Sequence, residues 1–187
     1  MELLWAAYEK DVNTKLSSLE REDLEATRRP KEIFFHDVAP FAEGAMSAFL
    51  ASHFSTLSAP GPEEPALQVL ILASSALRVL EIIRKLVPLK TRIAKLFARH
   101  MKVNEQIEAL SKGHFRIGVG TPARINKIIE EKPALFNNVA TVILDQWVDS
   151  KKQTLLSLKD TRKDVWWYWD HYLAKRCFEE KTRIALI

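Results

Sequence analysis

Leu67–Ala73, with the sequence LQVLILA, is a nearly continuous apolar run. Such a run is typical of a strand that is buried on both faces of a parallel sheet. Ser74-Ser75 follows as the N-cap of a helix that extends to about Leu86, and Pro88 closes that helix. This strand–helix unit indicates an α/β protein.

The same alternation continues to the end of the chain. Further strands are predicted over residues 92–98, 115–119, 140–144 and 182–187, and helices over 103–110, from 122 onward, around 155 and over 165–178. Strands that alternate with helices at this spacing predict one parallel sheet with flanking helices. We therefore expect a single α/β domain at residues 65–187.

Residues 1–64 have a different character. Apolar residues recur over residues 1–30 at spacings of three and four, which predicts an amphipathic helix. A turn-rich, uncharged segment follows and ends in the linker signal APGPEEP at residues 59–65. We expect a helical and extended arm whose apolar face packs against another protein or lies across the main domain.

The composition limits the class of protein. The 187 residues are 47% hydrophobic and 28% charged, which is typical of a globular protein. No span of about twenty apolar residues exists, so no membrane helix is expected, and Glu2 stands where a signal peptide needs basic charge. A single cysteine, Cys177, excludes an internal disulfide and a cysteine-based zinc site, and we expect it to be a buried, apolar side chain.

The positive charge is unevenly distributed. The net charge is +4, and eight basic residues stand against Glu81 alone between Arg78 and Lys102. A second basic stretch runs over residues 151–183. These stretches fit a solvated helix face with basic loops, or a surface that follows a phosphate backbone.

Three segments follow the carboxyl ends of predicted strands, where function is expected in such a sheet. Gly120–Arg124 (GTPAR) resembles the Gly-Thr-Pro-Gly-Arg motif of DEAD-box RNA helicases. Val142–Val148 resembles their Val-Leu-Asp-Glu-Ala-Asp element, and Ser74–Arg78 falls where Pro-Thr-Arg-Glu-Leu would stand. The resemblance covers residues 65–187 and implies a single RecA-like domain.

The chemistry of an active helicase is not expected, however. Gly113 and Gly118 have the glycine spacing of a P-loop, but Val119 follows where lysine is required. Gln146 replaces the glutamate that positions the attacking water, so it cannot take a proton. We expect no catalytic residue, cofactor, metal or small-molecule substrate, and Asp145 should cap the next helix or pair with a basic neighbour.

Other motifs point to a narrower family. Trp5-x-x-Tyr8, Leu16–Glu20 (LSSLE) and Trp166–Trp169 (WWYW) are not helicase motifs. Together with a helicase-like half that lacks the P-loop, they are similar to the "complementation of Mcm-ten suppressor" family of small-subunit processome proteins. The resemblance implies a non-catalytic assembly factor of the small ribosomal subunit in the nucleus and nucleolus. Its implied partners are pre-ribosomal RNA and ribosome-assembly proteins in the 90S pre-ribosome.

The resemblance to helicases implies RNA-backbone contacts at Ser75, Arg78, Thr121 and Arg124. Thr121 offers a hydroxyl at a helix N-terminus, where phosphate is favoured, and Arg124 offers a bidentate contact. The alternative for Thr121 is an ordinary N-cap before Pro122, which explains the same spacing.

The aromatic residues Trp5, Tyr8, Trp166, Trp167 and Trp169 are candidates for binding a partner. Adjacent helix positions lie about 100° apart, so the three clustered tryptophans cannot all face one way. At least one should be exposed or should anchor a partner, with core packing as the alternative.

Two other functions stay open at this point. A protein-only adaptor could keep the helicase fold without binding RNA. An ATP-dependent RNA helicase is disfavoured by the missing P-loop.

Overall fold

The fold is an α/β domain built on a single sheet. A computed structural model describes residues 8, 10–11, 44–54, 66–99 and 101–187. The strands are β1 (Val69–Leu72), β2 (Ile93–Leu96), β3 (Ile117–Gly120), β4 (Thr141–Leu144) and β5 (Arg183–Leu186). All pairings are parallel and the order is β2-β3-β1-β4-β5. The predicted RecA-like parallel sheet is confirmed, and each strand lies within one residue of its predicted range.

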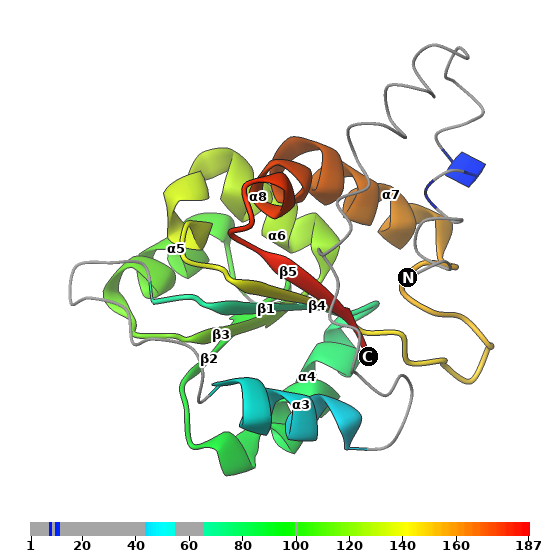
Figure 1. Cartoon of the computed structure of the whole chain (residues 1–187), viewed down its shortest axis with the longest axis horizontal. Helices are drawn as coiled ribbons and strands as arrows, with labels where there is room; N and C mark the ends of the chain where they lie inside the picture. Colours follow the sequence, from blue (N-terminus) through cyan, green and yellow to red (C-terminus); the bar gives the residue numbers. More distant parts are fainter. Residues whose placement is uncertain (1–7, 9, 12–43, 55–65, 100) are drawn as a thin grey trace.

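Helices cover both faces of the sheet. Figure 1 shows α3 (Ala45–Phe54) and α4 (Ala76–Lys85) on one face. The opposite face carries α5 (Val103–Lys112), α6 (Pro122–Glu131), α7 (Lys159–Tyr168) and α8 (Ala174–Phe178). Two 3₁₀ turns, η1 (Val87–Leu89) and η2 (Pro133–Phe136), and a π-helical turn, η3 (Trp169–Leu173), complete the elements.

The strands have a hydrophobic core on each side, as the apolar run at Leu67–Ala73 predicts. In β1, Leu70 and Leu72 face the core below α5–α8, whereas Val69 and Ile71 face the core below α3 and α4. All four are fully buried. Cys177 is also buried, as expected, and burial raises the pKa of its thiol to about 12.

The strands end in register, which fixes the functional edge of the sheet. Leu72 of β1 pairs with Gly120 of β3 and with Leu144 of β4. Gly120 pairs in turn with Leu96 of β2, and Leu144 with Leu186 of β5. The loops after β1, β2, β3 and β4, and Ile187 after β5, therefore start at the same edge.

One segment differs from its prediction. The turn-rich stretch predicted before the linker contains α3, so that prediction is wrong over residues 45–54. Leu50 is fully buried, and Met46 and Phe49 pack against the same core. The helix forms because its apolar side chains cover the sheet beside α4, a tertiary contact that local composition does not reveal.

The C-terminal helical region also differs. Residues around Leu155 form a turn rather than a helix, because Thr154 and Ser157 exchange side chain–backbone hydrogen bonds. The following helix begins at Lys159, six residues before the predicted start at Val165.

Other predictions fall outside the described residues. These are Trp5, most of the helix over residues 1–30, the stretch LSSLE and the linker at 59–65. The division into an arm (1–64) and a domain (65–187) stays a prediction for the same reason. Among the described residues, no helix has the length and apolar character needed to cross a membrane.

Candidate functional site

The carboxyl ends of β1 and β3 bring Ser75 and Thr121 to neighbouring positions. The backbone N–H of Ala73 donates to the carbonyl of Gly120 (2.9 Å), and that of Thr121 donates to the carbonyl of Leu96 (3.0 Å). Each of the two hydroxyl residues then starts a helix. Ser75 is exposed and its Oγ accepts from the N–H of Arg78 (3.2 Å), which confirms the predicted N-cap of α4.

Thr121 occupies the N-cap position of α6, with Pro122 as the first helical residue. Its side chain makes no capping hydrogen bond. The ordinary N-cap explanation therefore accounts for its position but not for its hydroxyl. Within the described ranges, that hydroxyl has no hydrogen-bond partner at the edge of the sheet, beside the end of β2.

Arg124 connects α6 to α5. It is 8% exposed, and its Nη1 donates to the side-chain oxygen of Gln106 (3.1 Å). Gln106 in turn donates to the carbonyls of Lys95 and Phe97, at the end of β2. Within the described part of the chain, the other N–H groups of Arg124 make no hydrogen bond. Through Gln106, Arg124 thus links α6 to the end of β2.

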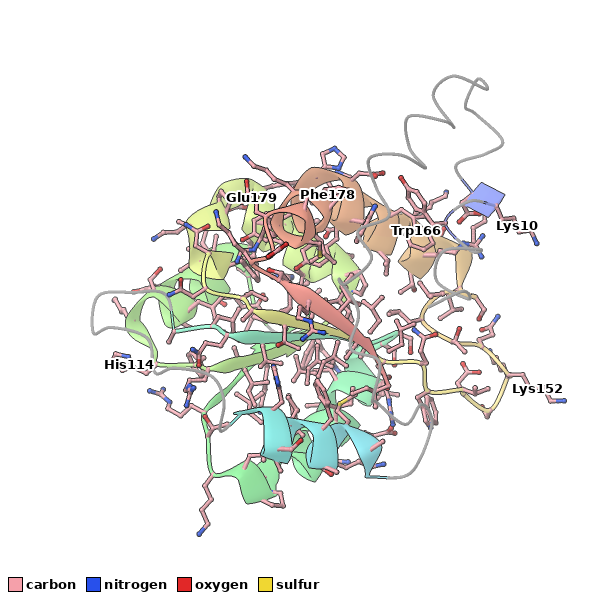
Figure 2. All side chains as sticks on the ribbon, in the orientation of Figure 1. Lys10, His114, Lys152, Trp166, Phe178 and Glu179 are labelled. Atoms are coloured by element: carbon pink, nitrogen blue, oxygen red, sulfur yellow. The ribbon has the colours of Figure 1, made fainter. Side chains whose placement is uncertain are left out.

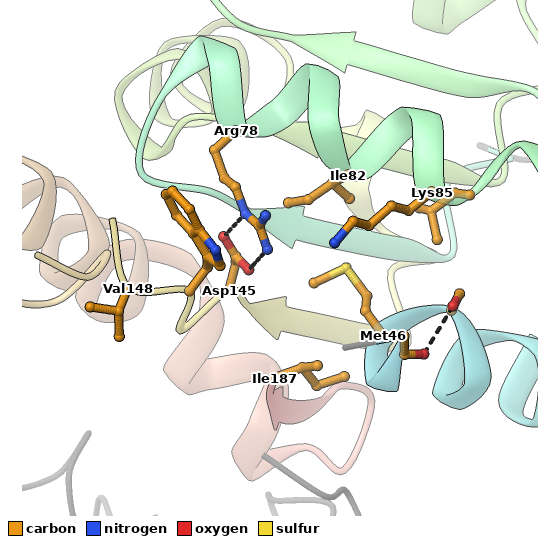
Figure 3. A pocket seen from close by; sticks show the side chains of 11 residues that line it. Met46, Arg78, Ile82, Lys85, Asp145, Val148 and Ile187 are labelled. Carbon is orange, nitrogen blue, oxygen red and sulfur yellow. Dashed lines mark hydrogen bonds and ion pairs between the residues drawn. The ribbon is translucent and has the colours of Figure 1, made fainter. Parts of the chain in front are cut away.

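Arg78 is fully engaged by carboxylates of its own chain. Its Nε and Nη2 donate to the two oxygens of Asp145 (2.8 and 2.9 Å), and its Nη1 donates to Glu81 (3.1 Å). The side chains of Arg78 and Asp145 are 10% and 2% exposed, so the ion pair is buried. Burial alone would lower the pKa of Arg78, but these two carboxylates raise it above its ordinary value. Figure 3 shows the bidentate pair between α4 and the loop after β4.

The Arg78–Asp145 ion pair decides between the two expectations for Asp145. This residue pairs with a basic neighbour and does not cap a helix. Because both carboxylate oxygens accept from Arg78, a metal ion would have to displace the guanidinium. Across the described ranges, no group of three or more potential metal-ligating side chains occurs. Gln146 is buried next to Asp145 and carries no carboxylate.

A cavity of about 470 Å³ opens beside this ion pair, between α3, α4 and the ends of β4 and β5. Its lining includes Arg78 and Asp145, and its other residues are mostly apolar or small. They are Gly44, Met46, Ser47, Ile82, Lys85, Leu86, Trp147, Val148 and Ile187. At the rim, Trp147 is 41% exposed and lies against the guanidinium of Arg78, 4.7 Å from its ring centre.

Trp166 and Trp169 of the domain contact Tyr8, which belongs to the described part of the arm. Tyr8 is buried, with edge-on ring contacts to Trp166 (5.1 Å) and Trp169 (6.4 Å), and its hydroxyl donates to Asp170. Trp166 and Trp169 are themselves 8% and 6% exposed. The arm thus lies across the main domain here, which is one of the two alternatives for it.

Asp11 strengthens this contact. It accepts hydrogen bonds from Arg162 through both oxygens and from the indole N–H of Trp166 (2.8 Å). In Figure 2, Lys10 and Trp166 lie at the same end of the molecule. Burial alone would raise the pKa of Asp11, but the bonds from Trp166 and Arg162 lower it below the ordinary 3.8.

Trp167 differs from its two neighbours, because it is only half-buried and stacks on His171 with ring centres 4.4 Å apart. This agrees with the prediction that the three tryptophans cannot share one environment. Partner binding by any of these aromatic residues stays a prediction.

Asp11→Ala should loosen the contact that Tyr8 and Asp11 make with α7. We expect a loss of about 1 kcal/mol in the free energy of unfolding, a small value because the Asp11–Arg162 pair is partly exposed. Since the folded pKa of Asp11 is lowered, this stability is present above pH 3.8 and is lost as the pH falls through the folded pKa. Urea denaturation at pH 7 and pH 3 measures both effects. Glu179→Ala, which removes the exposed ion pair with Lys181, is the control and should change little.

Sequence reasoning missed the cavity and the role of Gln106. Trp147 lies inside the helicase-like segment Val142–Val148, so its position could have drawn attention, but its exposure could not be foreseen. Met46 and Ser47 could not be identified as lining residues, because the sequence did not predict the helix α3 that carries them.

Comparisons with known proteins identify the family. The family model described as "CMS1: U3-containing 90S pre-ribosomal complex subunit" matches residues 3–187. Protein CMSS1 of Danio rerio is 36% identical over 121 residues, which cover 63% of this chain and 42% of that protein. Protein CMSS1 of Homo sapiens is 30% identical over 127 residues (66% and 46%), and Protein CMS1 of Chaetomium thermophilum is 31% identical over 116 residues (60% and 45%). The matched region spans less than half of the length of each of these relatives. Because the family model covers nearly all of the sequence, this chain belongs to the CMS1 family.

Proposed function

We propose that this chain is a non-catalytic assembly factor of the small ribosomal subunit. It acts in the 90S pre-ribosome, in the nucleolus, and binds pre-ribosomal RNA and assembly proteins. Membership of a family described as subunits of the U3-containing 90S pre-ribosomal complex supports the particle and the compartment.

The observation that carries RNA binding is the arrangement at the carboxyl ends of β1, β3 and β2. The hydroxyl of Thr121 makes no capping bond, and among the described residues the guanidinium of Arg124 donates only to Gln106. Lys102, the exposed N-cap residue of α5, lies one helical turn before Gln106, the partner of Arg124. The hydroxyls of Ser75 and Thr121, an arginine and a lysine, placed at three helix N-termini, suit the phosphates of one RNA strand. We name this set the RNA edge.

Arg78 has a different part in this proposal. All three of its guanidinium nitrogens already donate to Asp145 or Glu81. A phosphate contact by Arg78 would require the buried pair to open, which is costly. Arg78 therefore supports the RNA edge by holding the start of α4 and the loop after β4.

A non-catalytic role is supported by the same pair. The carboxylate that would hold magnesium in a helicase accepts from Arg78 through both oxygens, and Gln146 follows in place of an acid. Water activation for phosphoryl transfer needs both groups.

The double variant Lys102→Gln/Arg124→Gln should bind RNA about tenfold more weakly at fixed salt. Its dependence of log Kd on log salt should also become shallower, because fewer counterions are released from the RNA. Fluorescence anisotropy with a labelled 20-nucleotide single-stranded RNA, over a series of salt concentrations, measures both quantities.

Arg84→Gln is the matched control, since Arg84 is an exposed arginine at the far end of α4. It should leave the salt dependence nearly unchanged. Equal affinity of the double variant and the unmodified chain at matched salt would remove the RNA edge from the proposal.

A protein-only adaptor is the second candidate, and the full engagement of Arg78 favours it. If this candidate is correct, the chain should still sediment in a large particle after nuclease treatment. The purified chain should also show no saturable binding of RNA. Saturable RNA-stimulated ATP hydrolysis would contradict both candidates and support a helicase.

A further inference from the structure

The cavity at the ends of β4 and β5 has an apolar floor and a lysine in its wall. Ile82 and Leu86 of α4, Met46 of α3 and Ile187 line it with hydrocarbon. Lys85 also lines it, and Figure 3 shows its ammonium on the side that faces Met46. Among the described residues, the Lys85 ammonium has no hydrogen-bond or ion-pair partner.

The charges on the cavity wall favour a ligand with one acidic group. Arg78 is neutralised by Asp145 and Glu81, so the guanidinium offers little to a further anion. Among the described residues that line the cavity, Lys85 is the cation without such a partner. An apolar group on the floor and a carboxylate near Lys85 would match this distribution.

The rim supplies an aromatic anchor. Trp147 lies against a guanidinium whose three nitrogens donate to the carboxylates of Asp145 and Glu81, and the tryptophan itself is 41% exposed. Val148 beside it is 50% exposed and continues the apolar surface beyond the cavity. An exposed tryptophan that packs against an arginine next to a pocket is a suitable anchor for a protein partner.

We propose that this cavity, the β4–β5 pocket, docks an extended peptide segment of a partner protein that carries a large apolar side chain next to a carboxylate. The apolar side chain enters between Met46, Ile82 and Ile187. The carboxylate pairs with Lys85, and the peptide backbone crosses Trp147. A nucleic acid fits less well, because the lining is mostly apolar and a phosphate would gain only Lys85. The proposal does not depend on the RNA edge, which lies at the ends of the other three strands.

The test uses the ¹⁵N-labelled 187-residue chain and the peptide acetyl-Gly-Asp-Phe-Glu-Gly-amide. The indole N–H signals of the tryptophans are followed in ¹⁵N–¹H correlation spectra, and the signal lost in Trp147→Ala identifies Trp147. We expect that signal to shift saturably with the acidic peptide. A peptide with Asn and Gln in place of the acids should bind at least about fivefold more weakly, and one with Ala in place of Phe about tenfold more weakly.

Two variants of the chain test the two halves of the pocket. Lys85→Glu should weaken binding of the acidic peptide at least about tenfold. In Trp147→Ala, the shifts of other pocket residues should no longer saturate. The matched controls, Arg84→Glu and Phe178→Ala, should bind like the unmodified chain. Phe178 is a suitable control because it is 40% exposed, like Trp147, but lies on α8 across the sheet. Dispersed spectra show that each variant is folded.

Several results would overturn the proposal. These are the absence of a saturable shift, equal binding of neutral and acidic peptides, or equal loss in the control variants. A single-stranded RNA that shifts Trp147 more strongly than the peptide would assign the pocket to nucleic acid. Lys85→Glu should leave RNA affinity nearly unchanged and Lys102→Gln/Arg124→Gln should leave peptide affinity unchanged, so the two proposals fail separately.

Discussion

Arg78→Met is expected to destabilise the folded protein by about 3–5 kcal/mol. The substitution leaves the carboxylate of Asp145, whose side chain is 2% exposed, without its cationic partner. An unpaired buried carboxylate loses the hydration that it has in the unfolded chain and gains nothing in exchange. Chemical denaturation at pH 7, followed by tryptophan fluorescence, measures the change.

The double variant Arg78→Met/Asp145→Leu separates the cost of the buried charge from the loss of packing. Once both charged groups are replaced by apolar ones of similar size, most of the stability should return. Lys112→Met is the control for loss of an ion pair, because the pair with Glu108 is exposed and should matter little. If the double variant is as unstable as Arg78→Met, the unpaired charge is not the cause.

Gly120→Ala should be the second most damaging change, at about 3 kcal/mol. A Cβ at this position would lie 2.4 Å from the carbonyl oxygen of Leu96 and 2.6 Å from its Cβ. These atoms belong to or adjoin the backbone of β2, so they cannot rotate away, and the two strands would have to separate. The thermal midpoint and the free energy of unfolding in urea measure the effect.

The same change should weaken RNA binding, because the N–H of Thr121 donates to the carbonyl of Leu96 that is pushed away. Gly118→Ala is the matched control. Its added Cβ meets only the ends of leucine side chains, at 3.0 Å from Leu96 and 3.1 Å from Leu67, and these can move. We expect a cost of about 1 kcal/mol for it. If the two substitutions lower the free energy of unfolding equally, the clash with the backbone of β2 is not the cause of the loss at Gly120.

Some features of the site could be predicted from local sequence. Ser75 is a local N-cap signal, and the structure confirms it. Thr121 before Pro122 marks a helix start in the same way. Such signals are readable because the hydrogen bonds or steric restraints that produce them join residues only a few positions apart.

Other features required the folded chain. Arg78 and Asp145 are 67 residues apart, and Tyr8 meets Asp170 across 162 residues. Basic and acidic residues are plentiful in this sequence, so spacing alone could not select these partners. The helix α3 was missed for a related reason, since it is stabilised by contact with the sheet rather than by a periodic pattern.

The fold class, the strand positions and the family could all be predicted from local patterns, because apolar runs and short motifs are local properties of the chain. The contacts of those motifs, in contrast, are set by the tertiary fold. It pairs Asp145 with Arg78, covers Trp166 with Tyr8 and opens a pocket beside Trp147. Each of these outcomes depends on which distant surfaces meet when the strands align in one parallel sheet, and the free energy of burying those surfaces selects the partners.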